Sequence, residues 1–274
     1  MQVRRTQVSL RGGANVQVYD TGEGPALLML HAGVSDHRMW DDQWERLQNH
    51  FRLVRFDWRG FGETAHTPGE FSYAEDVLRI MDALHIDRAI LMAASFGGGV
   101  AIQVAVEHPE RVAKMVLVGP GVPGYHGHNP PHVEREFRRA DEAWDRGDTT
   151  DFLSRMEALW IIGPGRQEAQ VDPGYLARAR TLLASIDRPQ NGAESDGGGR
   201  LAVGQLNRLT IPTLVVVGDQ DVPEVMDAAQ YLRGALPDVE LEVIHDAAHL
   251  PNLEKPVAFH QVLSRWLGMR KGAS

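Results

Sequence analysis

Three residues of the chain, Ser95, Asp221 and His249, have side chains that together could attack a carbonyl carbon. A serine hydroxyl is a weak nucleophile at neutral pH unless a histidine takes its proton, and the charged histidine then needs a carboxylate beside it. Each of the three comes at or shortly after the end of a short apolar run, which is typical of a buried strand. The pattern indicates nucleophilic catalysis through Ser95.

Two nearby residues compete for the roles of acid and base. Asp219 precedes Asp221 in the same segment, and His245 precedes His249. His245 directly ends its apolar run, whereas a helix-like segment follows His249. His249 is therefore the favoured base, with His245 as the alternative, whereas either Asp221 or Asp219 could be the acid at this point.

The segment around Ser95 has the pattern of a strand, a sharp turn and a helix. The apolar run Ala89–Ala94 predicts the strand, and a helix is predicted at Val100–His108. Such a turn strains the backbone of the serine and requires small residues two positions before and after it, which Ala93 and Gly97 provide. The alternative is a glycine-rich turn that binds phosphate, although the spacing fits neither common nucleotide-binding motif.

Short apolar runs alternate with helix-like segments along most of the chain. This alternation predicts an α/β fold with a mostly parallel sheet and helices on both faces, in which ligands bind beyond the carboxyl ends of the strands. Val3–Leu10 and Asn15–Asp20 alternate apolar and polar residues and predict an antiparallel hairpin at one sheet edge. The other predicted strands are Ala26–Leu30, Phe51–Phe56, Ala89–Ala94, Val112–Val118, Pro212–Val217 and Val239–Ile244. The predicted helices between them are Asp41–Asn49, Phe71–His85, Val100–His108, Val225–Ala235 and Leu250–Leu267.

The middle of the chain, residues 122–206, has no buried-strand pattern. Helices are predicted within Glu134–Trp160 and at Pro173–Ile186, and a polar surface loop at Pro189–Arg200. We interpret this region as a helical lid inserted into a single domain. The core of that domain is then formed by residues 1–121 and 207–274.

Four segments resemble conserved motifs of the α/β-hydrolase family. Ala93-x-Ser95-x-Gly97 resembles the nucleophile elbow, usually Gly-x-Ser-x-Gly, with one extra methyl group at Ala93. Serine, acid and histidine also occur in the family's order. The resemblance implies the α/β-hydrolase fold and a Ser95, Asp221, His249 triad. The other three segments are Gly218–Pro223 (the acid turn), Ala248–Pro256 (Gly-His…Glu-x-Pro) and Asp57–Gly62 (Asp-x-Arg-Gly-x-Gly).

The resemblance also implies an oxyanion hole made of two backbone N–H groups. One belongs to Phe96, directly after the nucleophile. The other belongs to Gly33, because His31–Gly33 resembles the family's His-Gly-x loop, and Val34 is the alternative donor. His31 is expected to brace this loop.

Two further groups of residues are expected to have structural roles. Asp57 and Arg59 are expected to form an ion pair. The tract after Tyr125 contains His126, His128 and His132, but it has no acidic or cysteine partner at ligand spacing. A solvated hinge of the lid is therefore favoured over a metal site, and no metal or organic cofactor is expected.

Four residues are candidates for substrate binding: Val34, Tyr125, Trp160 and Leu250. The aromatic residues of the lid have an alternative role, because such side chains commonly pack helices together. The lid is where substrate specificity is expected to reside, and its sequence is the least informative part of the chain.

Composition excludes several classes of function. The chain has 274 residues, 43% of them hydrophobic, a formal net charge of −9 and no cysteine. Disulfides and thiolate chemistry are therefore excluded, and nucleic-acid binding is disfavoured. The segment Met1–Thr6 lacks the apolar core of a signal peptide, and no run approaches the roughly 18 apolar residues of a membrane span. We expect a cytoplasmic protein that binds neither nucleic acid nor membrane.

The function implied by the resemblance is hydrolysis of a small carboxylic ester or lactone through an acyl-enzyme. The chain is similar to 3-oxoadipate enol-lactonases and esterases, and Ser95-Phe-Gly-Gly-Gly99 resembles the elbow of cofactor-free perhydrolases. Carbon–carbon bond hydrolases use the same triad, and some relatives are non-catalytic receptors of small molecules. Serine in place of aspartate at position 95 disfavours dehalogenase and epoxide-hydrolase chemistry.

Overall fold

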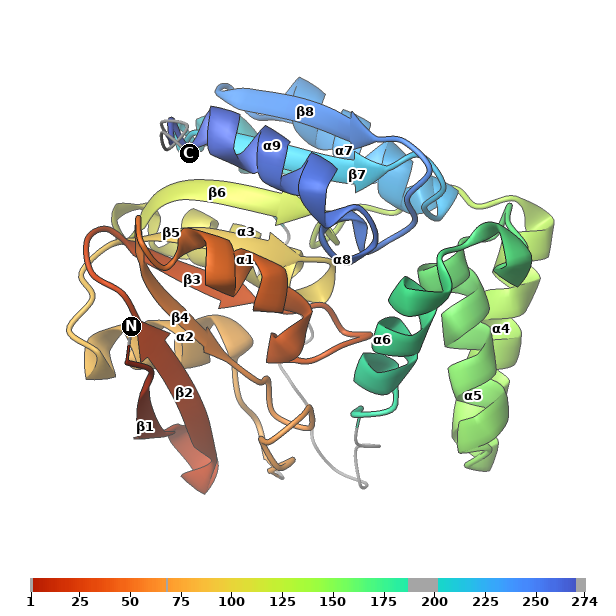
Figure 1. The fold of residues 1–274 in the computed structure, drawn as a ribbon, viewed down its shortest axis with the longest axis horizontal. Helices are drawn as coiled ribbons and strands as arrows, with labels where there is room; N and C mark the ends of the chain where they lie inside the picture. The colour runs from red at the N-terminus through yellow and green to blue at the C-terminus, as the bar shows by residue number, and fades with distance from the viewer. Residues whose placement is uncertain (1, 68, 187–201, 270–274) are drawn as a thin grey trace.

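The computed structural model describes residues 2–67, 69–186 and 202–269 (Figure 1). Its strands form one eight-stranded sheet in the order β1-β2-β4-β3-β5-β6-β7-β8. The β1–β2 and β2–β4 pairs are antiparallel and all the others are parallel, which confirms the α/β architecture and the edge hairpin. The strands are β1 (Arg4–Ser9), β2 (Asn15–Thr21), β3 (Ala26–Leu30), β4 (Arg52–Phe56), β5 (Ala89–Ala94), β6 (Val112–Val118), β7 (Thr213–Gly218) and β8 (Val239–Ile244).

Helices cover both faces of the sheet, with α1 and α9 on the near face in Figure 1 and α2, α3 and α7 on the far face. Because both faces are covered, β5 and β7 are buried at every residue and read as unbroken apolar runs. The helices are α1 (Asp41–Leu47), α2 (Tyr73–Ala83), α3 (Phe96–Glu107), α4 (Pro131–Arg146), α5 (Thr149–Met156), α6 (Pro173–Leu183), α7 (Pro223–Ala235), α8 (Pro251–Glu254) and α9 (Pro256–Trp266).

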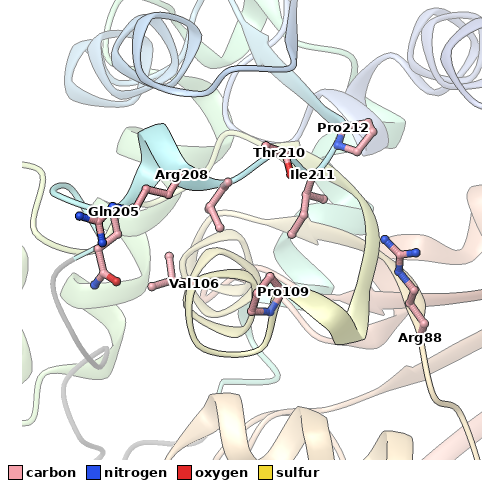
Figure 2. A pocket seen from close by; sticks show the side chains of 9 residues that line it. Arg88, Val106, Pro109, Gln205, Arg208, Thr210, Ile211 and Pro212 are labelled. Atoms are coloured by element: carbon pink, nitrogen blue, oxygen red, sulfur yellow. The ribbon is translucent and has the colours of Figure 1, made fainter.

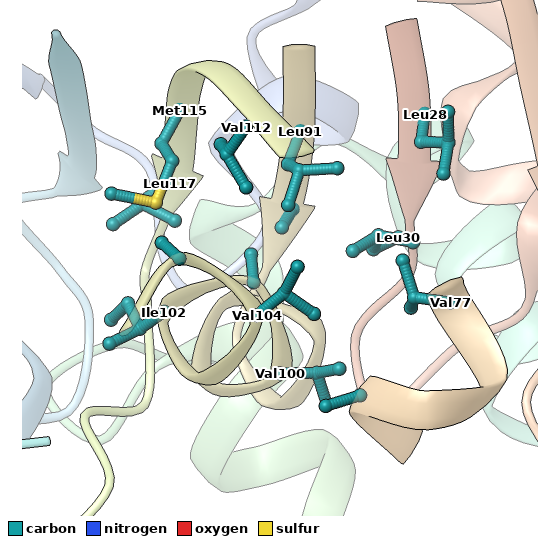
Figure 3. Close-up of a cluster of buried hydrophobic side chains, with 14 of the residues drawn as sticks. Leu28, Leu30, Val77, Leu91, Val100, Ile102, Val104, Val112, Met115 and Leu117 are labelled. Carbon is teal, nitrogen blue, oxygen red and sulfur yellow. The ribbon is translucent and has the colours of Figure 1, made fainter. Parts of the chain in front are cut away.

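The central helix α3 is buried against the middle strands. Val100 and Val104 of α3 pack in one apolar cluster with Leu91 of β5 and Leu117 of β6 (Figure 3). Burying a side chain of this size contributes roughly 1.5–3 kcal/mol relative to leaving it in water. This packing fixes the start of α3, and with it the turn that carries Ser95.

The largest departures from the predicted helices are at α3 and at the C-terminal segment. Helix α3 begins at Phe96 rather than at Val100, because the glycines after Ser95 adopt helical geometry at once. Within Glu134–Trp160, where helices were predicted without internal bounds, α4 ends just before Gly147, which has a left-handed φ of 75°. Leu250–Leu267 is divided into α8 and α9, because Pro256 cannot donate a backbone hydrogen bond and disfavours helical geometry at the preceding residue.

The helices α4, α5 and α6 form an insertion between β6 and β7, and they lie together beyond one end of the sheet (Figure 1). The chain enters the insertion from the carboxyl end of β6, the end at which α/β proteins bind ligands. A helical insertion in the middle of the chain is therefore confirmed. The predicted loop Pro189–Arg200 lies outside the described residues. No helix in the described ranges is long and apolar enough to cross a membrane.

Candidate active site

Ser95 occupies the sharp turn between β5 and α3. Its backbone has φ 50° and ψ −115°, a conformation that non-glycine residues rarely adopt and that costs roughly 1–3 kcal/mol. Three backbone hydrogen bonds hold the turn: Ser95 N–H donates to Val118 O at 2.9 Å, and Gly99 and Gly121 donate to Ser95 O at 3.1 and 3.0 Å. The strained serine is therefore supported by its own helix and by the residues at and beyond the end of β6.

The structure shows why the turn requires a small residue at position 97. A Cβ atom on Gly97 would lie 2.7 Å from the carbonyl oxygens of both Leu30 and His31. The neighbour that excludes a side chain there is the end of β3, not the strand that precedes the serine. Ala93 is fully buried and pairs with Leu30 in the sheet, so its methyl group is accommodated.

Asp221 and His249 are brought together in the interior. Nδ1 of His249 lies 3.0 and 2.9 Å from the two carboxylate oxygens of Asp221, and the two side chains are 1% and 0% exposed. Asp221 also accepts a hydrogen bond of 2.7 Å from the N–H of Val222. The carboxylate therefore favours the tautomer of His249 with its proton on Nδ1.

The other ring nitrogen of His249, Nε2, is buried and has no hydrogen-bond partner within the described part of the chain. In the tautomer favoured by Asp221, this nitrogen carries a lone pair and is available as a proton acceptor. The residues after β6 contact both parts of the site. A Cβ on Gly119 would lie 3.1 Å from His249 Nδ1 and 3.2 Å from Asp221 Oδ2, and Gly121 N–H donates to Ser95 O.

The two predicted oxyanion donors are adjacent. A Cβ on Gly33 would lie 3.4 Å from Cβ of Phe96. Phe96 is the first residue of α3, so its N–H points out of the positive end of a helix. The N–H groups of Gly33, Phe96 and the alternative donor Val34 donate to no acceptor among residues 2–67, 69–186 and 202–269. An oxyanion hole needs two such N–H groups aimed at one point, and Phe96 and Gly33 stay the predicted pair.

His31 braces the loop that carries Gly33, as predicted. Its Nδ1 donates to Ala32 O at 2.8 Å, and its Nε2 accepts from the N–H of Trp58 at 3.0 Å. Trp58 also donates from its indole nitrogen to His31 O at 2.9 Å. Burial lowers the pKa of His31, so the ring stays neutral and both hydrogen bonds persist at physiological pH.

The predicted ion pair between Asp57 and Arg59 is wrong. Arg59 forms a bidentate ion pair with Asp76 of α2, at 2.7 and 2.8 Å. Asp57 instead accepts hydrogen bonds from the backbone N–H and the ring of His37, at 2.7 and 2.8 Å, and from Glu63 N–H at 2.9 Å. The two residues separate because the turn after β4 directs their side chains to different neighbours.

The Asp57–His37 pair belongs to a small buried group that includes Asp36, whose ligating atoms lie within 4.8 Å of one another. All three side chains already have partners in the protein. Asp36 pairs with Arg38 at 2.6 Å, and His37 pairs with Asp57. Hydrogen bonds within the loop account for the group. The three histidines of the predicted hinge are exposed: His126, His128 and His132.

The alternative acid and base form a pair of their own. Nδ1 of His245 lies 2.9 Å from Asp219 Oδ2, but the two side chains are 84% and 28% exposed. Partial burial opposes ionisation of Asp219, yet the hydrogen bonds from His245, Gln220 and the N–H of Asp246 hold the pKa of that carboxyl below its usual value. This pair lies on the surface of the molecule.

Of the candidate substrate-binding residues, Trp160 contacts the buried pair directly. Its ring centroid lies 4.2 Å from that of His249, and its backbone oxygen accepts from His249 N–H at 3.3 Å. Val34 and Leu250 are buried together in one apolar cluster, against which Trp160 packs. Tyr125 stacks on Tyr231 of α7 at 4.8 Å and makes no recorded contact with the triad candidates in the described residues.

Sequence reasoning missed the residues that support this arrangement. Gly119 has a φ of 48° and packs against both Asp221 and His249, and a glycine directly after a buried strand is the signal that would have identified it. Arg166 and Glu254 form a buried ion pair at 2.8 Å beside the loop that carries His249. Their separation in the sequence left no signal of that pairing.

A separate cavity has a volume of about 350 Å³. Figure 2 shows the residues that line it. Its lining includes Arg88, Pro109 and Pro212, which precede β5, β6 and β7 respectively. These residues mark the amino ends of the parallel strands. The cavity is therefore distinct from the candidate site at the carboxyl ends.

Comparison with known proteins agrees with this fold. Residues 25–256 match the family model described as the α/β-hydrolase fold. The chain is 26% identical to a 2-hydroxymuconate semialdehyde hydrolase of a Pseudomonas species, over 97% of this chain and 94% of that protein. It is 25% identical to a 3-oxoadipate enol-lactonase of Acinetobacter baylyi, over 91% of each. Among solved structures, a thermophilic esterase from Thermogutta terrifontis superimposes with a TM-score of 0.79 at 26% identity, covering 97% of this chain and 98% of that one.

Proposed function

Because the chain belongs to the α/β-hydrolase fold family, we propose that it is a serine hydrolase that cleaves a small carboxylic ester or lactone. The observation that carries the proposal is the buried Asp221–His249 pair, in which Nε2 of His249 has no hydrogen-bond partner among the described residues. The residues after β6 contact both this pair and Ser95. A buried imidazole with one nitrogen bound to a carboxylate and the other unpaired is arranged as a general base.

In the first half-reaction, Ser95 Oγ attacks the substrate carbonyl carbon while His249 Nε2 takes the hydroxyl proton. Asp221 stabilises the imidazolium that forms. Collapse of the tetrahedral intermediate breaks the bond to the leaving oxygen, which receives the proton from His249. The acyl group remains on Ser95.

In the second half-reaction, His249 removes a proton from water, and the hydroxide attacks the acyl-enzyme. Collapse of this intermediate frees the carboxylic acid, and the proton returns to Ser95. The N–H groups of Phe96 and Gly33 stabilise the negative oxygen in both halves. Loss of one such donor typically costs about 100- to 1000-fold in rate.

A second candidate function is hydrolysis of a carbon–carbon bond with the same triad. The similarity to a 2-hydroxymuconate semialdehyde hydrolase favours it, and that similarity extends over most of both chains. The enol-lactonase and the esterase favour the ester or lactone assignment. The two candidates differ in the bond that breaks after Ser95 and His249 have engaged the carbonyl group.

The test is hydrolysis of p-nitrophenyl acetate by the wild type and by Ser95→Ala. We expect turnover by the wild type and a loss of at least about 10⁴-fold in the variant, as is typical of a nucleophile in such a triad. A non-catalytic receptor would leave the ester intact in both proteins. Comparable hydrolysis by the two proteins would place the chemistry elsewhere.

A further inference from the structure

The lid and the loop that carries His249 are joined by backbone contacts at the candidate site. The lid segment after α5 is a π-helical turn, Glu157–Ile162, and such turns are commonly found at functional sites. Within it, Trp160 O accepts the backbone N–H of His249 at 3.3 Å. The orientation of His249 therefore depends on where the lid places one carbonyl group.

The residue after this turn, Gly163, lies between the loop that carries Asp221 and the loop that carries His249. We refer to these as the acid loop and the histidine loop. Gly163 has a φ of 93°, and a Cβ built on it would overlap the carbonyl oxygen of Gln220 and lie 3.3 Å from Cβ of Ala248. Gln220 directly precedes Asp221, and Ala248 directly precedes His249. The lid thus contacts the residue before each member of the buried pair.

A single guanidinium group holds this junction together. Arg166 forms a bidentate ion pair with Glu254, at 2.8 and 3.2 Å, and the side chains are only 8% and 2% exposed. It also donates to Ile162 O in the lid, at 2.6 Å, and to Asp246 O in the histidine loop, at 3.1 Å. Arg166 therefore bonds to both sides of the junction.

Glu254 extends this connection to the residue next to the base. Its Oε2 accepts the backbone N–H of Ala248 at 2.8 Å. The path from Arg166 through Glu254 to Ala248 consists of charge-assisted hydrogen bonds in a buried setting, which are stronger than neutral ones. The N–H of Ala248 is thus bound by a carboxylate that Arg166 contacts directly, and the N–H of His249 is bound by Trp160 O, in the same π-helical turn as the Ile162 carbonyl that Arg166 contacts.

We propose that Arg166 is a positioning residue for catalysis, which fixes the lid to the histidine loop and so holds His249 against Asp221. This inference rests on the proposed function, because it assigns Arg166 a role in a reaction at Ser95. Arg166 makes no contact with the reacting atoms in this account. Its effect passes through Glu254, Ala248 and the carbonyl group of Trp160.

The chain contains a matched control for this role. Arg178 of α6 also pairs with a core residue, Asp42 of α1, at 3.0 Å, but the side chains are 45% and 28% exposed. The pair joins the lid to the core without contacting the histidine loop. Arg178→Met therefore removes a lid–core ion pair and leaves the junction intact.

The experiment compares Arg166→Met, Glu254→Gln, the double variant of these two and Arg178→Met with the wild type in two measurements. The first is kcat and KM for p-nitrophenyl acetate, at a temperature where melting curves show each protein folded. The second is amide hydrogen exchange of the peptide that contains residues 247–249, which needs no turnover. Glu254→Gln keeps an acceptor for Ala248 N–H and serves if Arg166→Met does not fold.

We expect Arg166→Met to lower kcat by about 10- to 100-fold with KM changed less than about twofold, because small displacements of a catalytic group cost this much. Exchange at residues 247–249 should accelerate at least about tenfold in that variant, since a broken contact frees both amides. Glu254→Gln should act in the same direction, and the double variant should be no slower than Arg166→Met alone.

A purely structural role predicts a different result, in which Arg166→Met lowers the melting temperature while its kcat equals that of Arg178→Met. That outcome, or unchanged exchange at residues 247–249, overturns the proposal. A wild type that does not hydrolyse the ester contradicts the proposed function instead. In that case accelerated exchange would retain Arg166 as the residue that holds the loop, and would end its assignment to catalysis.

Discussion

Two aspartate–histidine pairs follow the same two strands, and only one of them is buried. Asp219–His245 and Asp221–His249 both have a shortest distance of 2.9 Å. The first pair is 84% exposed at its histidine, and the second is 1% exposed. Exposed ion pairs interact weakly because water screens them, whereas burial strengthens both the attraction and the cost of losing it. Burial, not distance, distinguishes the two pairs.

A third pair shows that burial alone is also insufficient. Asp57 and His37 lie 2.8 Å apart in the interior. Asp57 also accepts two backbone N–H groups, and the ring of His37 stacks on Tyr19 at 4.9 Å. These contacts hold the turn after β4 against the loop after β3. A catalytic pair needs burial together with an unpaired ring nitrogen, and His249 Nε2 is buried without a hydrogen-bond partner in the described residues.

The largest effect is expected from removing the buried base. His249→Ala should lower kcat/KM for p-nitrophenyl acetate by about 10⁴- to 10⁶-fold, because the serine hydroxyl then has no proton acceptor. Circular dichroism should show that the variant is folded. Residual activity above about a tenth of the wild type would mean that another residue is the base.

The next largest effect is expected from neutralising the buried acid. Asp221→Asn presents an amide N–H₂ group to Nδ1 of His249 and favours the tautomer in which Nε2 carries the proton. The rate should fall by about 10³- to 10⁴-fold, while KM changes little. Asp219→Asn is the matched control, and an equal loss in that variant would assign the acid to Asp219.

The buried Asp57–His37 pair should affect stability rather than catalysis. Burial opposes ionisation of Asp57, but its hydrogen bonds to His37 and Glu63, with the nearby His31 and His37 rings, lower the pKa of Asp57 to about 2. The unfolded value is about 3.9, so the stabilisation is complete above pH ~4 and is lost as the pH falls towards ~2. Asp57→Asn should therefore cost about 2 kcal/mol at pH 7.

The check for Asp57 is urea unfolding of the wild type and Asp57→Asn at pH 7 and pH 3. The difference in unfolding free energy should be smaller at pH 3, because the Asp57 carboxyl is mostly protonated in the unfolded chain there and stabilises the folded state less. A difference that does not depend on pH would contradict this assignment.

The smallest effect is expected at the exposed pair. His245→Ala should change kcat/KM less than about twofold and stability by less than about 0.5 kcal/mol, as is usual for exposed ion pairs. A loss of activity comparable to that of His249→Ala would reverse the assignment of the two pairs.

Most of the sheet was predictable because its central strands are apolar over most of their length, while the edge strand β8 alternates apolar residues with glutamates. β3, β5, β6 and β8 match their predicted ranges at both ends. Helix ends were less predictable, because they depend on single residues such as Gly147 and Pro256. The π-helical turn at Glu157–Ile162 has no comparable signal in the sequence.

The residues of the candidate site were predictable to the extent that they follow strands. Asp221 and Asp219 have the same residue type and nearly the same position, so only their burial in the fold separates them. The partner of Arg59 was predicted wrongly, because Asp76 lies on α2 and reaches Arg59 only through packing. The ion pair of Arg166 with Glu254 joins the lid to the histidine loop and was invisible for the same reason.

The most direct test is covalent labelling with a serine-directed fluorophosphonate, followed by peptide mapping of the modified residue. We expect one label per chain on Ser95, a much slower reaction in His249→Ala, and an unchanged rate in His245→Ala. A label on another residue, no label on the folded wild type, or equal rates in the wild type and His249→Ala would contradict it.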